Sequence, residues 1–474
     1  MKRTASYLIA LQVSFCMAMA AAISSGPQSN DAANRVARDI FRQLIEINTT
    51  DSIGNVTTAA EAMAKRLRDA GYPESDIQVI GPNDRKKNLV ARLHGTGAHK
   101  PILLIGHLDV VEARREDWSI NPFQFIEKDD YFYGRGTEDI KDGDAILMSA
   151  MIRVKQEGYK PDRDIIVALT ADEEGGDFNG VEWLHKNHPA LIDADFVLNP
   201  DGGYFEIENG KKSLVGIQAS EKTYQDFELK VTNRGGHSSL PTPDNAIYEL
   251  ANGLARLQQF KFPFELNEVS RAYFERTADI VGGSVGADMK AIAKTPPDIA
   301  AMARLEEVSY YNARMRTTCV ATMLQAGHAR NALPGMATAN VNCRILPGHT
   351  SEETKSTLEK VLNDPGIKVS PILTLGAGAR PTKPSPLRPD VMGALEKVVS
   401  KMWPGLPVVP QMDASASDSS ILRADGIPVY GVAGVFSDIE DDRSHGRDER
   451  VRVASFYEGV DFYYRLLKTL TSQQ

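Results

Sequence analysis

The sequence predicts an α/β fold that is interrupted by a smaller α+β module. Apolar strand-like runs alternate with amphipathic helical runs up to about residue 220, and the same alternation resumes near residue 384. Between these points the runs follow the order strand-helix-strand-strand-helix-strand. The length of 474 residues also exceeds what one ordinary core accommodates, so we expect two domains.

The first part of the chain opens with two helices and continues as alternating strands and helices. RVARDIFRQLIEIN places Val36, Ile40, Leu44 and Ile45 on one helical face. AAEAMAKRLRDAGY is a second amphipathic helix, which Gly71 ends. NLVARLHG and PILLIGH then read as strands, DAILMSAMIRVKQEG as a helix, and DIIVALT and ADFVLN as strands. This alternation indicates a sheet that helices cover on both faces.

From about residue 222 the pattern becomes that of a half-exposed sheet. TYQDFELKVT alternates as a strand, and NAIYELANGLARLQQF is a helix that Asp244 is placed to cap. TCVATMLQAG, ATANVNCRILPG and IKVSPILTL are further strands, and TSEETKSTLEKVLND is a helix. The stretch 260–315 fits none of these elements.

A proline- and glycine-rich run, GAGARPTKPSPLRPD, is expected to lead the chain back to the first sheet. VMGALEKVVSKMW, IPVYGVAGV and FYEGVDFYYRLLKTL then resume helix, strand and helix. We therefore expect a split main domain at 30–220 and 384–474, with an inserted domain at 221–383.

The N-terminus has the composition of an export signal. The basic start MKR precedes the apolar run YLIALQVSFCMAMAAAI and the polar run SSGPQSNDA, and AMA at 18–20 and AAA at 20–22 suit signal peptidase. We expect residues 1–22 to be a signal peptide and the protein to be exported, periplasmic or secreted. A retained N-terminal anchor is the alternative. No later run is long and apolar enough to span a membrane, so no membrane association is expected after cleavage.

Composition limits the class of partner. Hydrophobic residues make up 42% and charged residues 25%, as in soluble globular proteins, and the net charge of -9 argues against nucleic acid. Without the signal peptide, Cys319 and Cys343 are the two remaining cysteines. They could pair in an oxidising compartment, but the sequence leaves their separation open.

Acidic and histidine residues follow several of the predicted strands. In open α/β sheets, ligand sites lie at the carboxyl ends of strands, so these side chains are candidates for one site. Taken singly, each also has an ordinary explanation as a turn former or a solvated side chain. The candidates are His107 and Asp109 in IGHLD, Asp139 in GRGTEDIKDG, Glu173 and Glu174 in TADEEGG, Asp201 in NPDGG and His445 in RSHGRDER.

As a set, the motifs GHLDVV, YGRGTEDIKDG, TADEEGG, PDGG, GGHSS, GHARNALPG and CRILPG resemble those of the co-catalytic zinc exopeptidases and deacylases. That family includes glutamate carboxypeptidase, aminoacylase, carnosine dipeptidase and succinyl-diaminopimelate desuccinylase. The resemblance implies a zinc-exopeptidase-like catalytic domain with a mixed sheet between helices. It also implies an inserted lid or dimerisation domain of ferredoxin-like β-α-β-β-α-β order, through which a homodimer is possible.

The resemblance implies metal-ligating roles. His107 and Asp201 would bind one Zn²⁺, Glu174 and His445 the other, and Asp139 would bridge them. Imidazole nitrogen and carboxylate oxygen are ligands that zinc takes, although cobalt and manganese suit the same set.

Two further acids near these ligands would assist them. Asp109 would hydrogen-bond the His107 ring, and Glu173 would be the general base. The remaining acid of the ADEEGG run, Asp172, is expected to be structural.

The inserted domain contributes further candidates by the same resemblance. His237 would stabilise the tetrahedral oxyanion, in some relatives in the partner subunit's site, although it could be an ordinary loop histidine. Asn331 and Arg344 would hold the substrate, with Arg344 gripping a free carboxylate, although a structural ion pair is its alternative. Gly434 would offer backbone to the same end.

These features lead to one expected function and two alternatives. We expect an exported carboxypeptidase or dipeptidase that cleaves an amide bond next to a free carboxylate, with two Zn²⁺ ions per subunit and small peptides or N-acyl amino acids as substrates. A deacylase of the acetylornithine or succinyl-diaminopimelate type would use the same metal residues. A non-catalytic binding relative would keep the fold and lose the base or a ligand.

Overall fold

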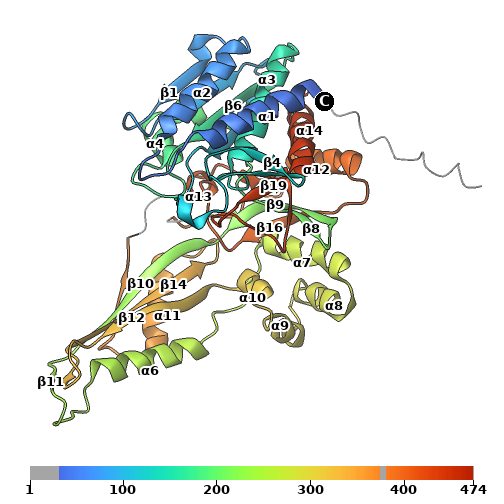
Figure 1. The fold of residues 1–474 in the computed structure, drawn as a ribbon. Coiled ribbons are helices and arrows are strands. Elements are labelled where there is room, and N and C mark those ends of the chain that lie inside the picture. The colour runs from blue at the N-terminus through green and yellow to red at the C-terminus, as the bar shows by residue number, and fades with distance from the viewer. Residues whose placement is uncertain (1–30, 374–379, 473–474) are drawn as a thin grey trace, which may run out of the picture.

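The computed structural model describes residues 31–373 and 380–472, which form a broad upper body and a long inserted domain below it (Figure 1). The predicted signal peptide at 1–22 and residues 376–379 of the predicted return linker lie outside the described residues. Among the residues that are described, no helix is both long and apolar enough to pass through a bilayer.

A mixed ten-stranded sheet forms the centre of the upper body. Its strand order is β1-β2-β6-β3-β7-β17-β9-β8-β18, with β16 beside β9, and β3 runs parallel to both β6 and β7. A smaller sheet has the order β19-β5-β4. The bounds are β1 (Ile77–Ile80), β2 (Asn88–Leu93), β3 (His99–His107), β4 (Ile126–Lys128), β5 (Tyr131–Tyr133), β6 (Arg163–Thr170), β7 (Phe196–Asn199), β8 (Phe205–Glu208), β9 (Lys211–Glu221), β16 (Val408–Asp413), β17 (Val429–Gly431), β18 (Phe436–Asp438) and β19 (Arg450–Arg452).

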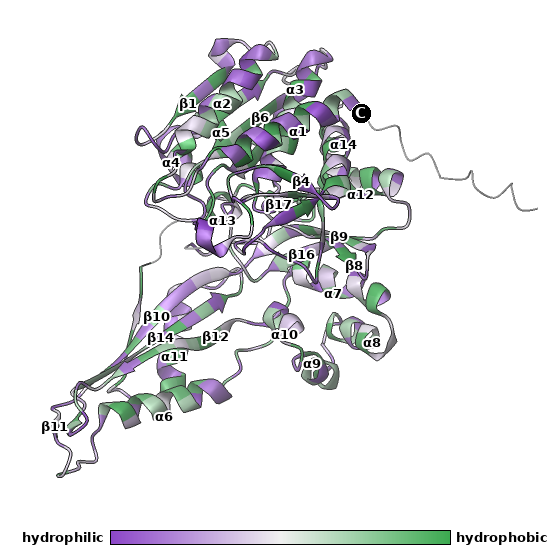
Figure 2. Cartoon of the chain, in the orientation of Figure 1, coloured by the Kyte–Doolittle hydropathy of each residue, from purple (hydrophilic) through white to green (hydrophobic). Residues whose placement is uncertain are grey.

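Helices cover both faces of this sheet, as the alternating pattern predicts. Along β3, Leu104 packs into the core beneath α1, α2, α3, α12 and α14, while its neighbour Leu103 packs into a second core beneath α4, α5 and α13. Figure 2 shows hydrophilic and hydrophobic residues alternating along helices such as α1 and α14, as expected when one side faces a core. The bounds are α1 (Asp31–Glu46), α2 (Val56–Asp69), α3 (Lys141–Gln156), α4 (Gly180–Asn187), α5 (Pro189–Ile192), α12 (Pro389–Met402), α13 (Ser419–Ala424) and α14 (Val453–Leu470), with 3₁₀ turns η1 (Glu74–Asp76) and η2 (Arg115–Asp117).

The inserted domain has the predicted ferredoxin-like order. Its antiparallel sheet runs β12-β14-β10-β15, and in chain order the elements are β10, α6, β12, β14, α11 and β15. Phe227, Leu229 and Val231 point from β10 into the core that α6 and α11 cover. The bounds are β10 (Thr223–Thr232), α6 (Ala246–Gln259), β12 (Thr318–Ala326), β14 (Met336–Ile345), α11 (Ser351–Leu362) and β15 (Lys368–Pro371), with a separate two-stranded antiparallel sheet of β11 (Gly236–His237) and β13 (Ala332–Leu333).

The cap of α6 differs from the prediction. Asn245, not Asp244, accepts hydrogen bonds from the N–H groups of Ile247 and Tyr248. Asp244 lies one residue earlier and faces Arg234 at 3.8 Å. Both residue types cap helices well, so the pattern could place the cap only to within one residue.

The stretch 260–315 forms four helices that pack on the main sheet. Tyr273 and Phe274 share a core with Leu214 of β9 and Val409 of β16. In Figure 1, α7 to α9 lie below β8 and β16, and α10 lies between them and the inserted sheet. The helices are α7 (Glu268–Val281), α8 (Gly283–Ile292), α9 (Ile299–Leu305) and α10 (Ser309–Met315). This stretch packs with the main domain, although its residues lie within the predicted bounds of the inserted domain, 221–383. The predicted domain boundaries stay a prediction.

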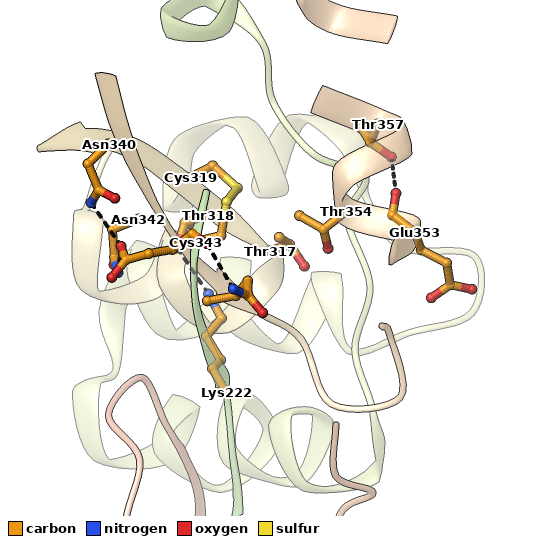
Figure 3. The surroundings of a disulfide bond; sticks show 12 residues. Lys222, Thr317, Thr318, Cys319, Asn340, Asn342, Cys343, Glu353, Thr354 and Thr357 are labelled. Carbon is orange, nitrogen blue, oxygen red and sulfur yellow. Dashed lines mark hydrogen bonds between the residues drawn. A yellow bond between two sulfur atoms is a disulfide. The ribbon is translucent and has the colours of Figure 1, made fainter. Parts of the chain in front are cut away.

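A disulfide joins the edge strand of the inserted sheet to its neighbour. Cys319 of β12 and Cys343 of β14 are register partners and are bonded (Figure 3). The pairing that the sequence left open is therefore present in the structure.

Candidate metal centre

The predicted metal ligands approach one edge of the main sheet from four loops. His107 ends β3, and Glu173 and Glu174 follow β6, which is the parallel neighbour of β3. Asp201 follows β7, on the other side of β3. Because the carboxyl ends of parallel neighbours meet at the same edge, these side chains lie together. Loops that precede α3 and β19 add Asp139 and His445.

Asp139 lies at the centre of the cluster. Its Oδ1 is 3.1 Å from Nε2 of His107, and its Oδ2 is 3.0 Å from Nε2 of His445. The His445 Nε2 also lies 2.9 Å from the Glu174 carboxylate. One carboxylate thus faces two histidines from distant parts of the chain, which is the arrangement that a bridging ligand requires.

Two overlapping groups of donor atoms are close enough to hold metal ions. His107, Asp139 and Glu174 form one, and His107, Glu173 and Asp201 form the other. The resemblance assigns Glu173 to proton transfer and His107 to a single ion, and this division of roles stays a prediction because the proximity of donor atoms alone does not test it. All five predicted ligands nevertheless belong to this one cluster.

The electrostatics of the cluster favour bound cations. Burial, followed by the charge of Asp201, raises the pKa of Glu173 well above its usual range, and burial followed by the charge of Asp139 does the same to Asp201. Hydrogen bonds to Asp139 and Glu174 raise the pKa of His445 to about 10. Without bound cations, Glu173, Asp201 and His445 therefore retain protons, which offset the negative charge of the cluster. Divalent ions offer the same compensation, and the imidazole and carboxylate donors fit zinc, cobalt or manganese.

Asp109 holds the site in a different way from that predicted. Its carboxylate accepts the backbone N–H groups of Glu173 at 3.2 Å and Glu174 at 3.0 Å. Its carboxylate oxygen is 3.8 Å from Nδ1 of His107, which instead donates to the Asp109 backbone carbonyl at 3.1 Å. Asp109 therefore orients the histidine through its main chain and the two glutamates through its side chain.

A buried ion pair between Arg135 and Glu449 joins the two ligand loops. Glu449 accepts Nη1 of Arg135 at 2.6 Å and the N–H groups of Glu138 at 2.7 Å and Asp139 at 3.2 Å. Arg135 donates in turn to the carbonyl of His445 at 3.3 Å. Arg135 thus holds the loop of His445, and Glu449 holds the loop of Asp139. Sequence reasoning missed both, and the only available signal was the glutamate four residues after His445.

Asp418 is a second buried acid that sequence reasoning missed. It accepts Nδ2 of Asn179 at 2.6 Å and lies near Thr170, directly below the glutamate loop. Burial raises its pKa to about 6. Its position in ASASDSS gave no signal, because nothing nearby in the sequence connects it to residues 170–179.

Asp172, the remaining acid of the ADEEGG run, is structural as expected. It forms a buried ion pair with Lys86, which also contacts Asp51 at 2.8 Å. It adopts a left-handed φ of 58° and accepts the N–H of Phe178 at 3.2 Å. Asp172 therefore anchors the turn that presents Glu173 and Glu174.

The structure does not bring His237 and Asn331 to the cluster. His237 is exposed, its Nδ1 contacts Ser239, and the Asn331 carbonyl accepts the N–H of Ser238. Both belong to the β11–β13 region, which Figure 1 shows at the far end of the inserted domain. Their predicted roles therefore require another conformation or another copy of the chain.

Arg344 and Gly434 lie in different surroundings. Arg344 stands at the junction of the two domains, where its Nη1 donates to the carbonyl of Ala414 at 3.0 Å. No carboxylate within the described residues pairs with it, so the structural ion pair considered as its alternative is not seen. Gly434 has φ of 75° and lies against the ring of Tyr463 in α14, where a Cβ would clash. The structure thus supplies a packing reason for this glycine, and its substrate role remains a prediction.

Comparisons with known proteins show what the chain as a whole is similar to. The model of peptidase family M20/M25/M40 matches residues 103–469. A probable carboxypeptidase S-like 2 of Dictyostelium discoideum is 28% identical over 380 residues, covering 78% of this chain and 71% of that protein. The N-fatty-acyl-amino acid synthase/hydrolase PM20D1 of Xenopus tropicalis is 27% identical over 377 residues, covering 78% and 72%. An M20 family metallo-carboxypeptidase, Sso-CP2 of Sulfolobus solfataricus, superposes with a TM-score of 0.65 at 16% identity, covering 92% of this chain and 99% of that one.

Proposed function

The chain belongs to peptidase family M20/M25/M40, and within that family we propose that it hydrolyses an amide bond adjacent to a free carboxylate. The similar proteins include a probable carboxypeptidase and an N-fatty-acyl-amino acid hydrolase, whose substrates share that arrangement. We assign the protein as an exported carboxypeptidase or dipeptidase that acts on small peptides or N-acyl amino acids.

The observation that carries the proposal is the position of Asp139 between His107 and His445, with one carboxylate oxygen directed to each ring. His107, Asp139, Glu174, Asp201 and His445 would hold two divalent ions, with zinc as the first candidate. Such ions polarise a carbonyl and lower the pKa of water at neutral pH.

Glu173 is the proposed proton carrier. It is adjacent to Glu174, but His445 pairs with Glu174, and the Glu173 carboxylate makes no hydrogen bond within the described residues. The Asp109 carboxylate fixes its backbone. Glu173 would take a proton from the attacking water and deliver it to the leaving nitrogen.

Arg344 is the proposed carboxylate-binding residue. Within the described residues, Nη1 donates to the carbonyl of Ala414 and the guanidinium lies over the ring of Tyr224 at 4.6 Å, which leaves Nε and Nη2 for a bidentate contact with a carboxylate. Its position between the domains would place the substrate carboxylate at the junction, and the scissile bond toward the metal cluster.

The oxyanion contact of His237 is proposed to come from a second copy of the chain. His237 lies far from the cluster of its own chain, at the end of the inserted domain (Figure 1). The edge strand β12 exposes Val320, Met323 and Leu324, and an open strand edge with apolar side chains favours pairing with another strand. These features support a homodimer through the inserted domain.

Export is proposed from the N-terminal sequence together with the disulfide. The basic, apolar and small-residue pattern of residues 1–22 suits a signal peptide. The Cys319–Cys343 bond suits an oxidising compartment, because disulfides are rare in reducing ones.

The deacylase alternative shares the metal residues and differs in its preferred acyl group. The export signal speaks against it, because reactions of the acetylornithine and succinyl-diaminopimelate type belong to cytoplasmic biosynthesis. The non-catalytic alternative is disfavoured because Glu173 and all five ligand residues are present.

The test replaces Glu173 by Gln in protein loaded with zinc, cobalt or manganese. A panel of dipeptides and N-acetyl amino acids, each with a free or an amidated carboxyl group, is assayed for hydrolysis. We expect kcat to fall by about 10²–10⁴-fold because the proton carrier is lost, while bound metal measured by elemental analysis is unchanged. Near-normal turnover in this variant would remove Glu173 from the mechanism, and wild type that cleaves only amidated substrates would refute the free-carboxylate requirement.

A further inference from the structure

Two tyrosines with large solvent exposure have no role in the proposed mechanism. Tyr204 follows the ligand Asp201 by three positions and is 44% exposed, and Tyr310 of α10 is 47% exposed. Large aromatic side chains are usually more deeply buried, and exposed ones often mark contact surfaces.

The guanidinium group of Arg314 packs against one face of the Tyr310 ring. The guanidinium carbon of Arg314 lies 3.6 Å from the centre of its ring and 5.1 Å from the ring of Tyr273. Nη1 of Arg314 donates to the Tyr310 carbonyl at 3.2 Å, and the hydroxyl groups of Tyr273 and Tyr310 are hydrogen-bonded. One face of the ring is thus fixed, while nearly half of the side chain stays open to solvent.

Tyr204 connects α10 to the metal cluster. The charge of Asp413, followed by burial and the charge of Asp201, raises the pKa of the Tyr204 hydroxyl. The nearby Arg314 lowers this pKa, and Tyr310 raises it. The Asp413 carboxylate accepts the N–H of Gly203 and Nε2 of Gln218. The next residue, Ala414, is the one whose carbonyl binds Arg344. The Tyr204 loop is thus connected through Gly203 and Asp413 to Ala414, which binds Arg344, and Tyr310 influences the Tyr204 hydroxyl from α10.

Two cationic side chains in the same region raise an alternative, which is a pocket for an acidic substrate side chain. Lys222 and Arg314 have no ion-pair partner among the described residues. Lys222 is only 1% exposed and Arg314 only 5%. The rings of Tyr273 and Tyr310 cover Arg314. Its positive charge also favours the ionised forms of Asp413 and Glu206. Neither cation is accessible to a substrate, whereas both tyrosines are.

We propose that Tyr204 and Tyr310 form the surface that receives the side chain next to the free carboxylate, so that the preferred substrates release a large apolar or aromatic amino acid. This inference rests on the proposed function and names its substrate class. Arg314 is the positioning residue for Tyr310. Stacking of an aromatic substrate side chain on a fixed tyrosine removes apolar surface from water without ordering a flexible side chain.

The test compares N-acetylphenylalanine, N-acetylalanine and N-acetylglutamate with wild type, Tyr204→Ala, Tyr310→Ala and Tyr310→Phe. We expect wild type to prefer the phenylalanine substrate, and each alanine variant to lose about 10–100-fold in kcat/KM on it but about twofold or less on N-acetylalanine. Tyr310→Phe keeps the ring and should retain the preference.

Tyr464→Ala is the matched control. The Tyr464 ring in α14 also lies under an arginine, Arg153, at 3.4 Å, but on the outer side of the main domain. This variant loses a comparable stacked tyrosine and should leave the preference unchanged. Equal losses on all three substrates in Tyr310→Ala, or a wild-type preference for N-acetylglutamate, would overturn the inference.

A binding measurement separates this inference from the proposed function. Metal-loaded Glu173→Gln protein is titrated with N-acetylphenylalanine and N-acetylalanine by calorimetry. Tighter binding of the phenylalanine compound that Tyr310→Ala abolishes supports the aromatic surface even if wild type hydrolyses neither compound. Hydrolysis by wild type with equal binding of both compounds would retain the function and reject the surface.

Discussion

Asp139 presents one carboxylate oxygen to His107 and the other to His445, so a single side chain relates two histidines that are far apart in sequence. Burial opposes its ionisation, but hydrogen bonds from both rings hold its pKa below the usual range. It is therefore charged, while the buried Glu173 and Asp201 favour their protonated forms until cations arrive. A ligand set of this kind exchanges protons for metal, so metal affinity should rise with pH.

Lys222 illustrates the opposite situation, a buried base without a carboxylate partner. Its Nζ donates to Oγ1 of Thr318 at 3.3 Å, next to the disulfide (Figure 3). Burial, followed by the charges of Arg344 and Arg314, lowers its pKa to about 7 from the ordinary 10.5. Between these values the unfolded chain binds more protons than the folded one, so the free energy of unfolding rises with pH across that window.

We expect Lys222→Met to stabilise the protein at pH 6 by about 1–4 kcal/mol, because the folded state no longer has to bury this charge. The gain should shrink as the pH approaches 10, where the lysine is neutral in the folded protein. Denaturant unfolding of wild type and variant at pH 6, 8 and 9.5 measures the difference. A difference that is independent of pH would contradict a lowered pKa at this position.

The sequence could predict which side chains form the candidate metal centre because each follows a recognisable strand or lies in a distinctive motif. His107, Glu174 and Asp201 are adjacent through strand pairing, which alternation along the chain already implies. Arg135 and Asp418 could not be found in this way. Their partners Glu449 and Asn179 lie hundreds of positions away, and only the folded chain brings such residues together.

At the scale of elements, the loops that carry Asp139 and His445 are held by one buried ion pair. Arg135 and Glu449 each bind the other loop's main chain, so the spacing between two ligands depends on a pair that touches no metal. His445 itself has a left-handed φ of 59°, which a non-glycine residue adopts only when its surroundings impose it.

We expect Glu449→Gln to weaken metal binding by about 10–100-fold, because supporting groups of this kind orient the ligands. Competition against a chromogenic chelator measures the affinity.

Glu221→Gln is the control for that experiment. Glu221 forms a comparably buried pair with Arg423 at 2.7 Å, but it contacts no ligand loop. It should lower stability and leave metal affinity within about twofold of wild type. Equal losses of metal affinity in both variants would mean that any buried ion pair has this effect, and would remove the special role of Glu449.

Most elements were predictable, and the exceptions share a cause. The inserted sheet, its two helices and the covered main sheet follow from local period and turn residues. Helices α7 to α10 were missed although the buried residues of α7 recur at helical spacing, and only the folded chain shows that residues such as Phe274 face β9 and β16. Tyr310 was missed with them, because its significance depends on Tyr204 and Arg314, which other elements supply.

At the scale of the whole molecule, the far end of the inserted domain extends away from the rest of the described residues (Figure 1). His237 and the exposed edge of β12 lie on the domain that extends away from the metal cluster (Figure 1). A two-fold related copy would pair identical edges and could bring each His237 to the other subunit's site.

Mixing two inactive variants tests this assembly. In the proposed homodimer, His237→Ala and Glu173→Gln proteins would each lack a group needed at both of their sites. In a mixed dimer, one site combines an intact Glu173 with an intact His237, so we expect recovery of about one quarter of wild-type activity after subunit exchange. A mixture that stays as inactive as its components would place His237 in its own chain's site.

The ion pair of Arg135 with Glu449 also bears on how the protein is made. About 240 residues separate Asp201 from His445, and ribosomes add about 5–20 residues per second, so the first four ligands wait about 12–50 s for the fifth. During that interval the nascent chain carries an acidic cluster without the loop that completes and braces it. If the five side chains bind two ions as proposed, the site is complete only once residue 445 has been made, and a truncation before His445 would remove the fifth ligand together with Glu449.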